Sequence, residues 1–466
     1  MRRPIVTFAG VALTAALLVL TAVPATALPA GSLDPTFGLG GITVANFHDG
    51  YPTCTWDHSF PTCQGAEEDV SEVIPLADGS VVARIAAGGT LVVKFRPDGR
   101  LDTTFGHGGR TSIVGSAVGE LGIDHGGSIY VPWRPSPGTA PGSNAITKLL
   151  PSGEIDTSYG LAGTVLHDEN ERVKVVPSGQ VYLYRTGVEA NNDRSLRVSL
   201  LSIAGTPDPS YGDDGTATLL VPASAPDGWI VEPDPVVALG PGQEIVVLHR
   251  AYTSFGFFQL SRVVLGRLDP YGVPDLTFSP TGGVRFPAGP GWFPSLFQFN
   301  AKHLAVLPDG RILVAGVRPM PDGSAVSVVR LDAAGNLDPT FAFGGISIVE
   351  LTTAPASSGQ SYEALRWFGT DAAGRAIVVG DSGQPSTSGE RHHVVRLAPN
   401  GFLDASFGIG GTTTLPTEIA RGGTSFGTAP TGAVLIGGQA RSTDRLCGPT
   451  TNRVPCADSL LLKLRG

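Results

Sequence analysis

The chain has 466 residues and a net charge of −9, with 41% hydrophobic and only 16% charged residues. Its basic residues form no run, which excludes the clustered positive surface that nucleic acids and polybasic membrane binding require. Glycine (63 residues) and proline (38 residues) are abundant, a composition typical of many tight turns rather than long helices.

The first 27 residues have the features of a secretory signal peptide. Arg2 and Arg3 precede the apolar stretch VTFAGVALTAALLVLTAV, and ATA at 25–27 supplies small residues before a cleavage point. The alternative is an uncleaved membrane anchor, but no stop-transfer flank follows. No later apolar stretch is long enough to span a bilayer. We therefore expect residues 1–27 to be removed, and residues 28–466 to be a secreted, extracellular monomer without membrane contact.

An eleven-residue frame, GSLDPTFGLGG at its first occurrence, recurs along the chain with variations. Successive frames begin 68, 54, 52, 67, 63 and 66 residues apart. A period on this scale indicates a repeat architecture, in which each repeat forms one supersecondary unit. The seven frames begin at Gly31, Gly99, Gly153, Gly205, Gly272, Gly335 and Gly401.

Short strands surround each frame. A β-branched or leucine-rich strand precedes every later frame, as in LVVKF (91–95), and a hairpin with a tight turn lies upstream, as in LAVLPDGRILVAGV (304–317). A fourth strand, such as ISIV (346–349), follows the frame. Four antiparallel strands repeated seven times predict an all-β, seven-bladed β-propeller that forms a single domain over residues 28–466.

The two chain ends support this count. The chain opens with a frame and a fourth strand, GITVANF (41–47), and it closes with a third strand that no frame follows, LLLKL (460–464). We predict that the N-terminal outer strand pairs with the C-terminal third strand. This pairing completes the seventh blade, closes the ring and removes two exposed strand edges.

Each frame carries an aspartate and, three residues later, an aromatic residue. A short acceptor here satisfies turn amides, and one large apolar group per blade packs between neighbouring sheets. Seven calcium sites are the alternative, but a turn cap needs fewer assumptions. The pairs are Asp34 and Phe37, Asp102 and Phe105, Asp156 and Tyr159, Asp208 and Tyr211, Asp275 and Phe278, Asp338 and Phe341, and Asp404 and Phe407.

The pattern GxLDxxFGxGG, in which x is any residue, resembles the delta-60 repeat of secreted bacterial proteins. Between its copies lie hairpins of the type PDGxhhVAG, in which h is a hydrophobic residue. It is also similar in layout to NHL-type propellers, and the resemblance covers the chain from Leu33 onward. It implies a propeller and no settled activity, so no catalytic residue is carried over. Ser279 and Ala342 replace the glycine that follows the aromatic, and Pro207 and Pro274 replace the usual leucine. These departures predict irregular outer strands in those blades.

The four cysteines form two pairs nine positions apart, in loop-like stretches. Disulfides agree with export, whereas the CxxC spacing of structural zinc is absent. Local pairing is the first expectation, and cross-pairing that staples the ring closure is the alternative. The cysteines are Cys54 and Cys63, and Cys447 and Cys456.

Long connections concentrate where the second strand joins the third and where the fourth strand leads to the next blade. In an antiparallel blade these connections emerge on one face, which we call the long-loop face, and long loops on a rigid scaffold commonly bind ligands. Aromatic residues gather there, with packing over the blade ends as the alternative role. We expect a secreted binding scaffold that meets an extracellular glycan or protein through Trp56, Trp133, Trp229, Trp292, Phe255 and Phe257.

Two other functions remain open at this stage. A secreted metal-dependent lyase or hydrolase would place histidines on the long-loop face, and the candidate ligands of its divalent metal are His48, His167 and Asp168. However, HExxH, a nucleophile elbow and paired carboxylates of recognisable spacing are missing from the sequence, so we expect no cofactor. The third function is a structural surface protein that uses the ring as a rigid spacer.

Overall fold

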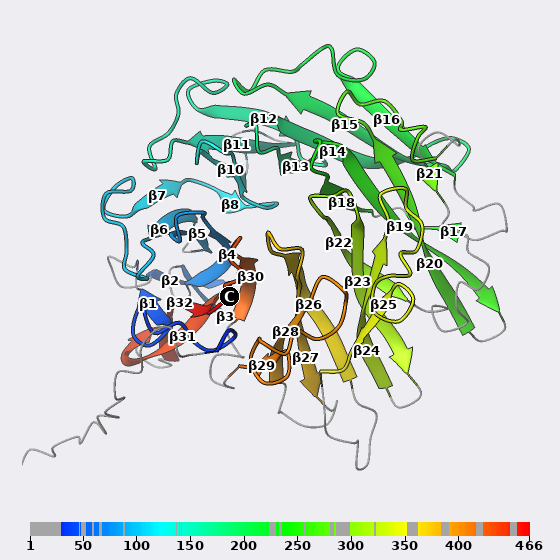
Figure 1. Cartoon of the computed structure of the whole chain (residues 1–466). Helices are drawn as coiled ribbons and strands as arrows, with labels where there is room; N and C mark the ends of the chain where they lie inside the picture. Colours follow the sequence, from blue (N-terminus) through cyan, green and yellow to red (C-terminus); the bar gives the residue numbers. More distant parts are fainter. Residues whose placement is uncertain are drawn as a thin grey trace, which may run out of the picture.

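The structure is a computed structural model, and the regular secondary structure of its described residues consists of β-strands (Figure 1). Among the residues that it describes, no helix is long and apolar enough to cross a membrane. Some strand ends are described by backbone alone, among them 53–57, 60–64, 253–255, 258–262, 440–447 and 454–458. The described residues are 29–45, 47, 53–57, 60–64, 68–86, 89–136, 138, 140, 142–222, 230–232, 235–255, 258–279, 284–285, 299–320, 323–351, 362–383, 391–415, 423–447 and 454–466.

Seven antiparallel sheets stand around a common centre and form a seven-bladed β-propeller, as predicted (Figure 1). The first three blades consist of β4 (Asp69–Pro75), β5 (Val81–Ala86), β6 (Thr90–Phe95) and β7 (Arg110–Ile113); of β8 (Ser116–Ala117), β9 (Gly122–Ile123), β10 (Ile129–Arg134), β11 (Ser143–Leu149) and β12 (Thr164–Asp168); and of β13 (Arg172–Val175), β14 (Val181–Val188), β15 (Arg194–Leu201) and β16 (Thr216–Val221).

The next three blades have the same strand order. They consist of β17 (Ile230–Val231), β18 (Val236–Leu239), β19 (Ile245–Phe255), β20 (Phe258–Leu268) and β21 (Val284–Arg285); of β22 (Asn300–Val306), β23 (Ile312–Met320), β24 (Gly323–Leu331) and β25 (Ile346–Val349); and of β26 (Tyr362–Thr370), β27 (Ala376–Gly383), β28 (Arg391–Leu397) and β29 (Thr412–Thr414).

The seventh blade is built from both ends of the chain. β30 (Gly423–Thr428), β31 (Val434–Cys447) and β32 (Val454–Leu464) are joined by β1 (Ile42–Ala45), which pairs with β32 in the register Ile42 to Leu462 and Val44 to Leu460. The predicted closure is therefore confirmed. A separate hairpin of β2 (Thr53–Asp57) and β3 (Phe60–Gln64) lies in the connection that leads to the first blade.

The two ends also rebuild a broken turn. In the first blade the turn before the frame is closed by Arg96, which accepts a hydrogen bond from the Gly99 N–H and donates one to the Arg100 carbonyl, both at 2.8 Å. In the seventh blade Arg465 accepts from the Gly31 N–H at 2.7 Å and donates to the Ser32 carbonyl at 2.9 Å. Residues 29–34 thus continue the turn where the C-terminal strand leaves it.

Apolar side chains fill the spaces between neighbouring blades. Between the second and third blades, for example, Tyr130, Ile146 and Tyr159 contact Val173 and Leu183. The aromatic residue of every frame is at most 2% exposed, so one ring per blade is removed from water almost completely. Each blade is held mainly by burial against its two neighbours, as expected for stacked sheets.

The predicted irregular outer strands are wrong in two blades, because β16 and β25 are continuous. Ala342 takes the place of a glycine and adopts its left-handed backbone, with φ of 42°. Its N–H still donates to the Asn400 carbonyl of the next blade at 2.6 Å, as the Gly38 N–H does to the Asp98 carbonyl at 2.7 Å. The inter-blade hydrogen bond therefore survives the substitution, at the cost of a strained φ.

Joining Arg465 to Pro29 in a head-to-tail cyclised protein, without Gly466, should stabilise the propeller. The junction repeats the Arg96–Pro97 sequence of the first blade, and cyclisation lowers the entropy of the unfolded chain by up to about 5 kcal/mol in free-energy terms. Chemical denaturation of the cyclic and linear proteins measures this difference. An equal or lower midpoint for the cyclic protein would show that the ends do not meet as described.

Candidate functional site

The face opposite the long loops, which we call the short-turn face, is organised by the frame aspartates. Oδ1 of Asp338 accepts hydrogen bonds from the backbone N–H of Thr340 at 3.0 Å and from its Oγ1 at 2.6 Å. The same cap recurs in every frame, since each aspartate is followed two positions later by threonine or serine. Each turn is therefore fixed by its own side chains.

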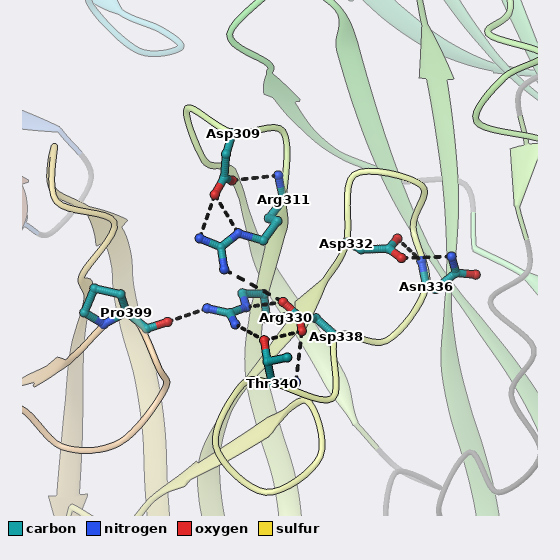
Figure 2. A network of polar contacts seen from close by, with 8 residues as sticks. All are labelled: Asp309, Arg311, Arg330, Asp332, Asn336, Asp338, Thr340 and Pro399. Carbon is teal, nitrogen blue, oxygen red and sulfur yellow. Dashed lines mark hydrogen bonds and ion pairs between the residues drawn. The ribbon is translucent and has the colours of Figure 1, made fainter.

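A cation from the third strand holds the second carboxylate oxygen in most blades. Arg330 Nε donates to Asp338 Oδ2 at 2.8 Å (Figure 2). The guanidinium carbon of Arg330 lies 4.6 Å from the centre of the Phe341 ring. Burial alone would raise the pKa of Asp338, but the bonds from Thr340 and the charge of Arg330 outweigh it and lower that pKa. The cation, the carboxylate and the ring thus form one unit.

This cation was not predicted from the sequence, although a lysine or arginine is visible near the end of third strands such as LVVKF and HVVRL. The lysine or arginine stands eight residues before the frame aspartate within the same blade. Its backbone carbonyl accepts a hydrogen bond from the backbone N–H of that aspartate. Ion pairs join Lys148 to Asp156, Arg267 to Asp275, Arg330 to Asp338, Arg396 to Asp404 and, across the chain ends, Lys463 to Asp34. In the third blade Leu200 stands at this position, so Asp208 caps its turn without the cation.

Arg330 also reaches the next blade. Its Nη1 donates to the Pro399 carbonyl and its Nη2 donates to Thr340 Oγ1 at 2.9 Å (Figure 2). Arg311 bonds to Asp309 and lies 3.8 Å from the Asp338 carboxylate. All three guanidinium nitrogens of Arg330 are used within the protein, so this network holds two blades together.

The channel at the centre of the ring carries a different kind of polarity. The first turn of each blade is closed by the same backbone hydrogen bond. Residues that stand the same number of positions before this turn therefore lie at equivalent heights on the inner strands. Charged or titratable side chains stand four or five residues before the turn in five of the seven blades. We call the set Glu72, Glu120, Glu171, Arg172, Lys302, His303 and Arg366 the channel belt.

Acidic groups lie on one side of this belt. Glu72 bonds to the Leu121 N–H of the next blade at 2.9 Å and pairs with Arg84 at 3.1 Å. Burial raises the pKa of Glu72 to about 7, against the opposing charge of Arg84. Glu120 pairs with Lys174 of the third blade at 2.6 Å, and this cation lowers the pKa of Glu120.

The opposite side of the belt is basic. Burial lowers the pKa of His303 in the fifth blade, the charge of Lys302 lowers it further, and Glu120 raises it from across the ring. In the sixth blade Asp381 accepts hydrogen bonds from both Arg366 Nε and His392 Nδ1. These two bonds outweigh burial and hold the pKa of Asp381 below its usual value.

The binding residues expected from the sequence are largely beyond the described part of the chain. Trp229, Trp292 and Phe257 lie outside the described residues, and Trp56 and Phe255 lie in strands whose side chains are not described there. Trp133 is described. It is half-buried on β10, packs against the cluster between the first two blades, and donates from Nε1 to Thr147 Oγ1 at 2.9 Å.

The structure describes two of the three metal-ligand candidates. His48 lies outside the described residues, and His167 and Asp168 are successive residues of β12. His167 is buried and lies 3.7 Å from Glu171, whereas Asp168 is exposed and caps its own turn through Asn170 at 2.8 Å. In the described part of the chain, no three histidine, cysteine or acidic side chains are arranged to hold a metal ion. The four cysteines have no described side chains.

Comparison with known proteins agrees with the propeller fold. Residues 307–341 and 374–407 are similar to the β-propeller family described as a domain of unknown function, DUF5122. These stretches run from the first turn to the frame aromatic in the fifth and sixth blades, and they include Arg311, Arg330 and Arg396. No curated protein matches the chain.

Solved structures with similar folds have varied functions. They include an endo-arabinase from Bacteroides thetaiotaomicron (14% identity, 64% of this chain and 94% of that chain, TM-score 0.31). Drosophila Semaphorin 2a (9%, 90% and 77%, 0.43) and a mutant of the Synechocystis apocarotenoid oxygenase (12%, 74% and 71%, 0.38) are further examples. At these values the likenesses carry no argument about activity or ligand.

Replacing Asp338 by asparagine should destabilise the protein far more than the same change at Asp208. Asparagine keeps an acceptor for the turn in both variants, but only Asp338→Asn leaves a buried arginine without its carboxylate, at a cost of about 3 kcal/mol. Urea denaturation at pH 7 measures the two unfolding free energies. Equal losses would mean that the cation adds nothing to the turn cap.

Glu72 should make the protein less stable as the pH rises. It holds its proton more tightly in the folded chain, with a pKa of about 7, than in the unfolded chain, where it is near 4.5. The resulting stabilisation is complete below pH 4.5 and is lost as the pH passes 7, a change of about 3 kcal/mol at most.

Denaturation at pH 5 and pH 8 of the wild type and of Glu72→Gln tests this sign. The difference between the two proteins isolates Glu72, because His303 titrates in both. We expect the wild type to lose more stability than the variant between these pH values. An equal loss in both would assign the pH dependence to other groups.

Proposed function

We propose that this chain is a secreted binding scaffold whose ligand, an extracellular glycan or protein, meets the long-loop face and the mouth of the channel. The observation that carries the proposal is the contrast between the two faces. On the short-turn face, polar groups form hydrogen bonds in the repeated turn caps and with the next blade. Polar groups that are already hydrogen-bonded within the protein are not available to bind a partner.

The hairpins between the second and third strands differ in length at the long-loop face. The β19–β20 hairpin continues until Phe255 pairs with Phe258, and the β31–β32 hairpin until Cys447 pairs with Val454. In contrast, β5 and β6 end at Ala86 and Thr90. Hairpins of unequal length favour recognition of a ligand from the long-loop face. The tryptophans of the connecting loops are suited to anchor such a ligand.

Export of the chain and local disulfides belong to the same proposal. The backbone of β2 and β3 places Cys54 directly opposite Cys63. Directly opposed residues in antiparallel strands have Cα atoms about 4.5–5.5 Å apart, within the span of a disulfide. This register supports local pairing at the first cysteine pair over a staple across the ring closure. The frames likewise support membership of the delta-60 repeat family.

Mature protein, residues 28–466, should bind selected members of a glycan array or extracellular matrix proteins, and loop tryptophans should carry the affinity. We expect Trp229→Ala and Trp292→Ala each to weaken binding at least about tenfold, the loss typical of an aromatic anchor. Trp133→Ala is the control, because its indole is used within the second blade and its loss should lower the unfolding temperature. Unchanged affinity in both loop variants would refute binding through these aromatics.

A further inference from the structure

We propose that Arg366, together with Lys302, forms an oxyanion site in the channel, and that its ligand is a small molecule or chain end bearing a carboxylate, as on a uronic acid. The inference deepens the proposed binding function by naming the ligand chemistry inside the ring. It rests on where the two cations stand, on how Arg366 is held, and on the charges opposite them.

Both cations occupy the same irregular position on adjacent inner strands. The pairing of β26 with β27 shifts register between Leu365 and Trp367, so Arg366 is the extra residue of a bulge. The pairing of β22 with β23 shifts between Ala301 and His303, which makes Lys302 the corresponding bulge residue. Bulges redirect a side chain away from the regular alternation of a strand.

Arg366 reaches solvent from the innermost strand of its blade. Its side chain is 50% exposed, and Lys302 is also exposed. β22 and β26 are the inner strands of their blades, and they lie next to each other around the middle of the ring (Figure 1). The fifth and sixth blades therefore carry two solvent-exposed cations on adjacent inner strands.

A buried carboxylate orients the arginine. Asp381 is almost fully buried and accepts from Arg366 Nε with one oxygen and from His392 Nδ1 with the other. The pKa of Asp381 lies below its usual value, so the carboxylate stays charged. Bonding through Nε fixes the plane of the guanidinium and turns its other edge outward.

That outer edge is available. In the described part of the chain, no residue accepts a hydrogen bond from Nη1 or Nη2 of Arg366. Arg330, in contrast, uses Nε, Nη1 and Nη2 for Asp338, Pro399 and Thr340. Two parallel N–H groups at the edge of a fixed guanidinium match the two oxygens of a carboxylate, and they also fit phosphate or sulfate.

The charges on the other side of the belt favour a carboxylate that is attached to hydroxyl groups. Glu120 is 68% exposed, and it repels a second anion while accepting hydrogen bonds from hydroxyls. A uronic acid offers a carboxylate to Arg366 and Lys302 and hydroxyls to Glu120. Inorganic phosphate or sulfate satisfies the cations alone.

Calorimetric titration of the mature protein with galacturonate, galactose, sulfate and phosphate tests the site. We expect galacturonate to bind and galactose, which differs only in lacking the carboxylate, not to bind. Arg366→Gln should weaken galacturonate binding by about 10- to 100-fold. Arg366→Lys, which keeps the charge but not the fork, and Asp381→Asn, which keeps the fork but not its orientation, should give intermediate losses. Arg311→Gln on the short-turn face is the matched control and should bind as the wild type does.

The outcomes separate the sources of the oxyanion. Binding of sulfate or phosphate in preference to galacturonate, with the same loss in Arg366→Gln, would support the site and assign it to an inorganic anion. No oxyanion binding, or binding that is unchanged in Arg366→Gln, would overturn the inference. Absence of oxyanion binding together with neutral glycans that bind the wild type and Arg366→Gln equally would overturn the inference and leave the proposed binding function standing.

Discussion

The carboxylate of each frame aspartate is the group on which the ring depends. One of its oxygens holds the turn through the threonine or serine two positions later, and in five blades the other pairs with a lysine or arginine of the third strand. That cation also lies over the frame aromatic in the same five blades. The turn, the third strand and the apolar contact with the next blade are therefore fixed together. Removing the carboxylate would leave a buried cation and loosen all three at once.

The same unit explains how an open chain closes a ring. Asp34 and Phe37 come from the N-terminal segment and Lys463 from the last strand, so the seventh blade is joined by the contacts that join each frame to its own third strand elsewhere. The β1–β32 pairing adds backbone hydrogen bonds and leaves no outer edge on β32. Closure needs no special device, because the repeat already contains the required interface.

Much of the fold was predictable from the sequence, because the repeat is long and its strands are short and apolar. The blade count, the closing pair and strands such as Ile346–Val349 follow from the pattern alone. The channel belt did not, because its members come from inner strands far apart in sequence, and bulges shift Lys302 and Arg366 out of the regular alternation. The surroundings of Trp133 could not be predicted either, because its neighbours, Thr147 and the apolar cluster between the first two blades, come from other strands.

The regularity of the frames also bears on where function can reside. Because every frame has the same turn cap on the short-turn face, the inner strands have equivalent heights around the centre of the ring, whatever residue they carry there. A change at such a position alters the chemistry of the inner strands while the frame contacts on the short-turn face stay the same, and in five blades the position carries a charged or titratable residue. The fifth and sixth blades combine both properties: they match the propeller family over their turns and frames, and they alone among the described bulges present cations. A rigid, repeated outer frame thus leaves the inner strand free to vary, and it holds whatever stands there in a fixed position.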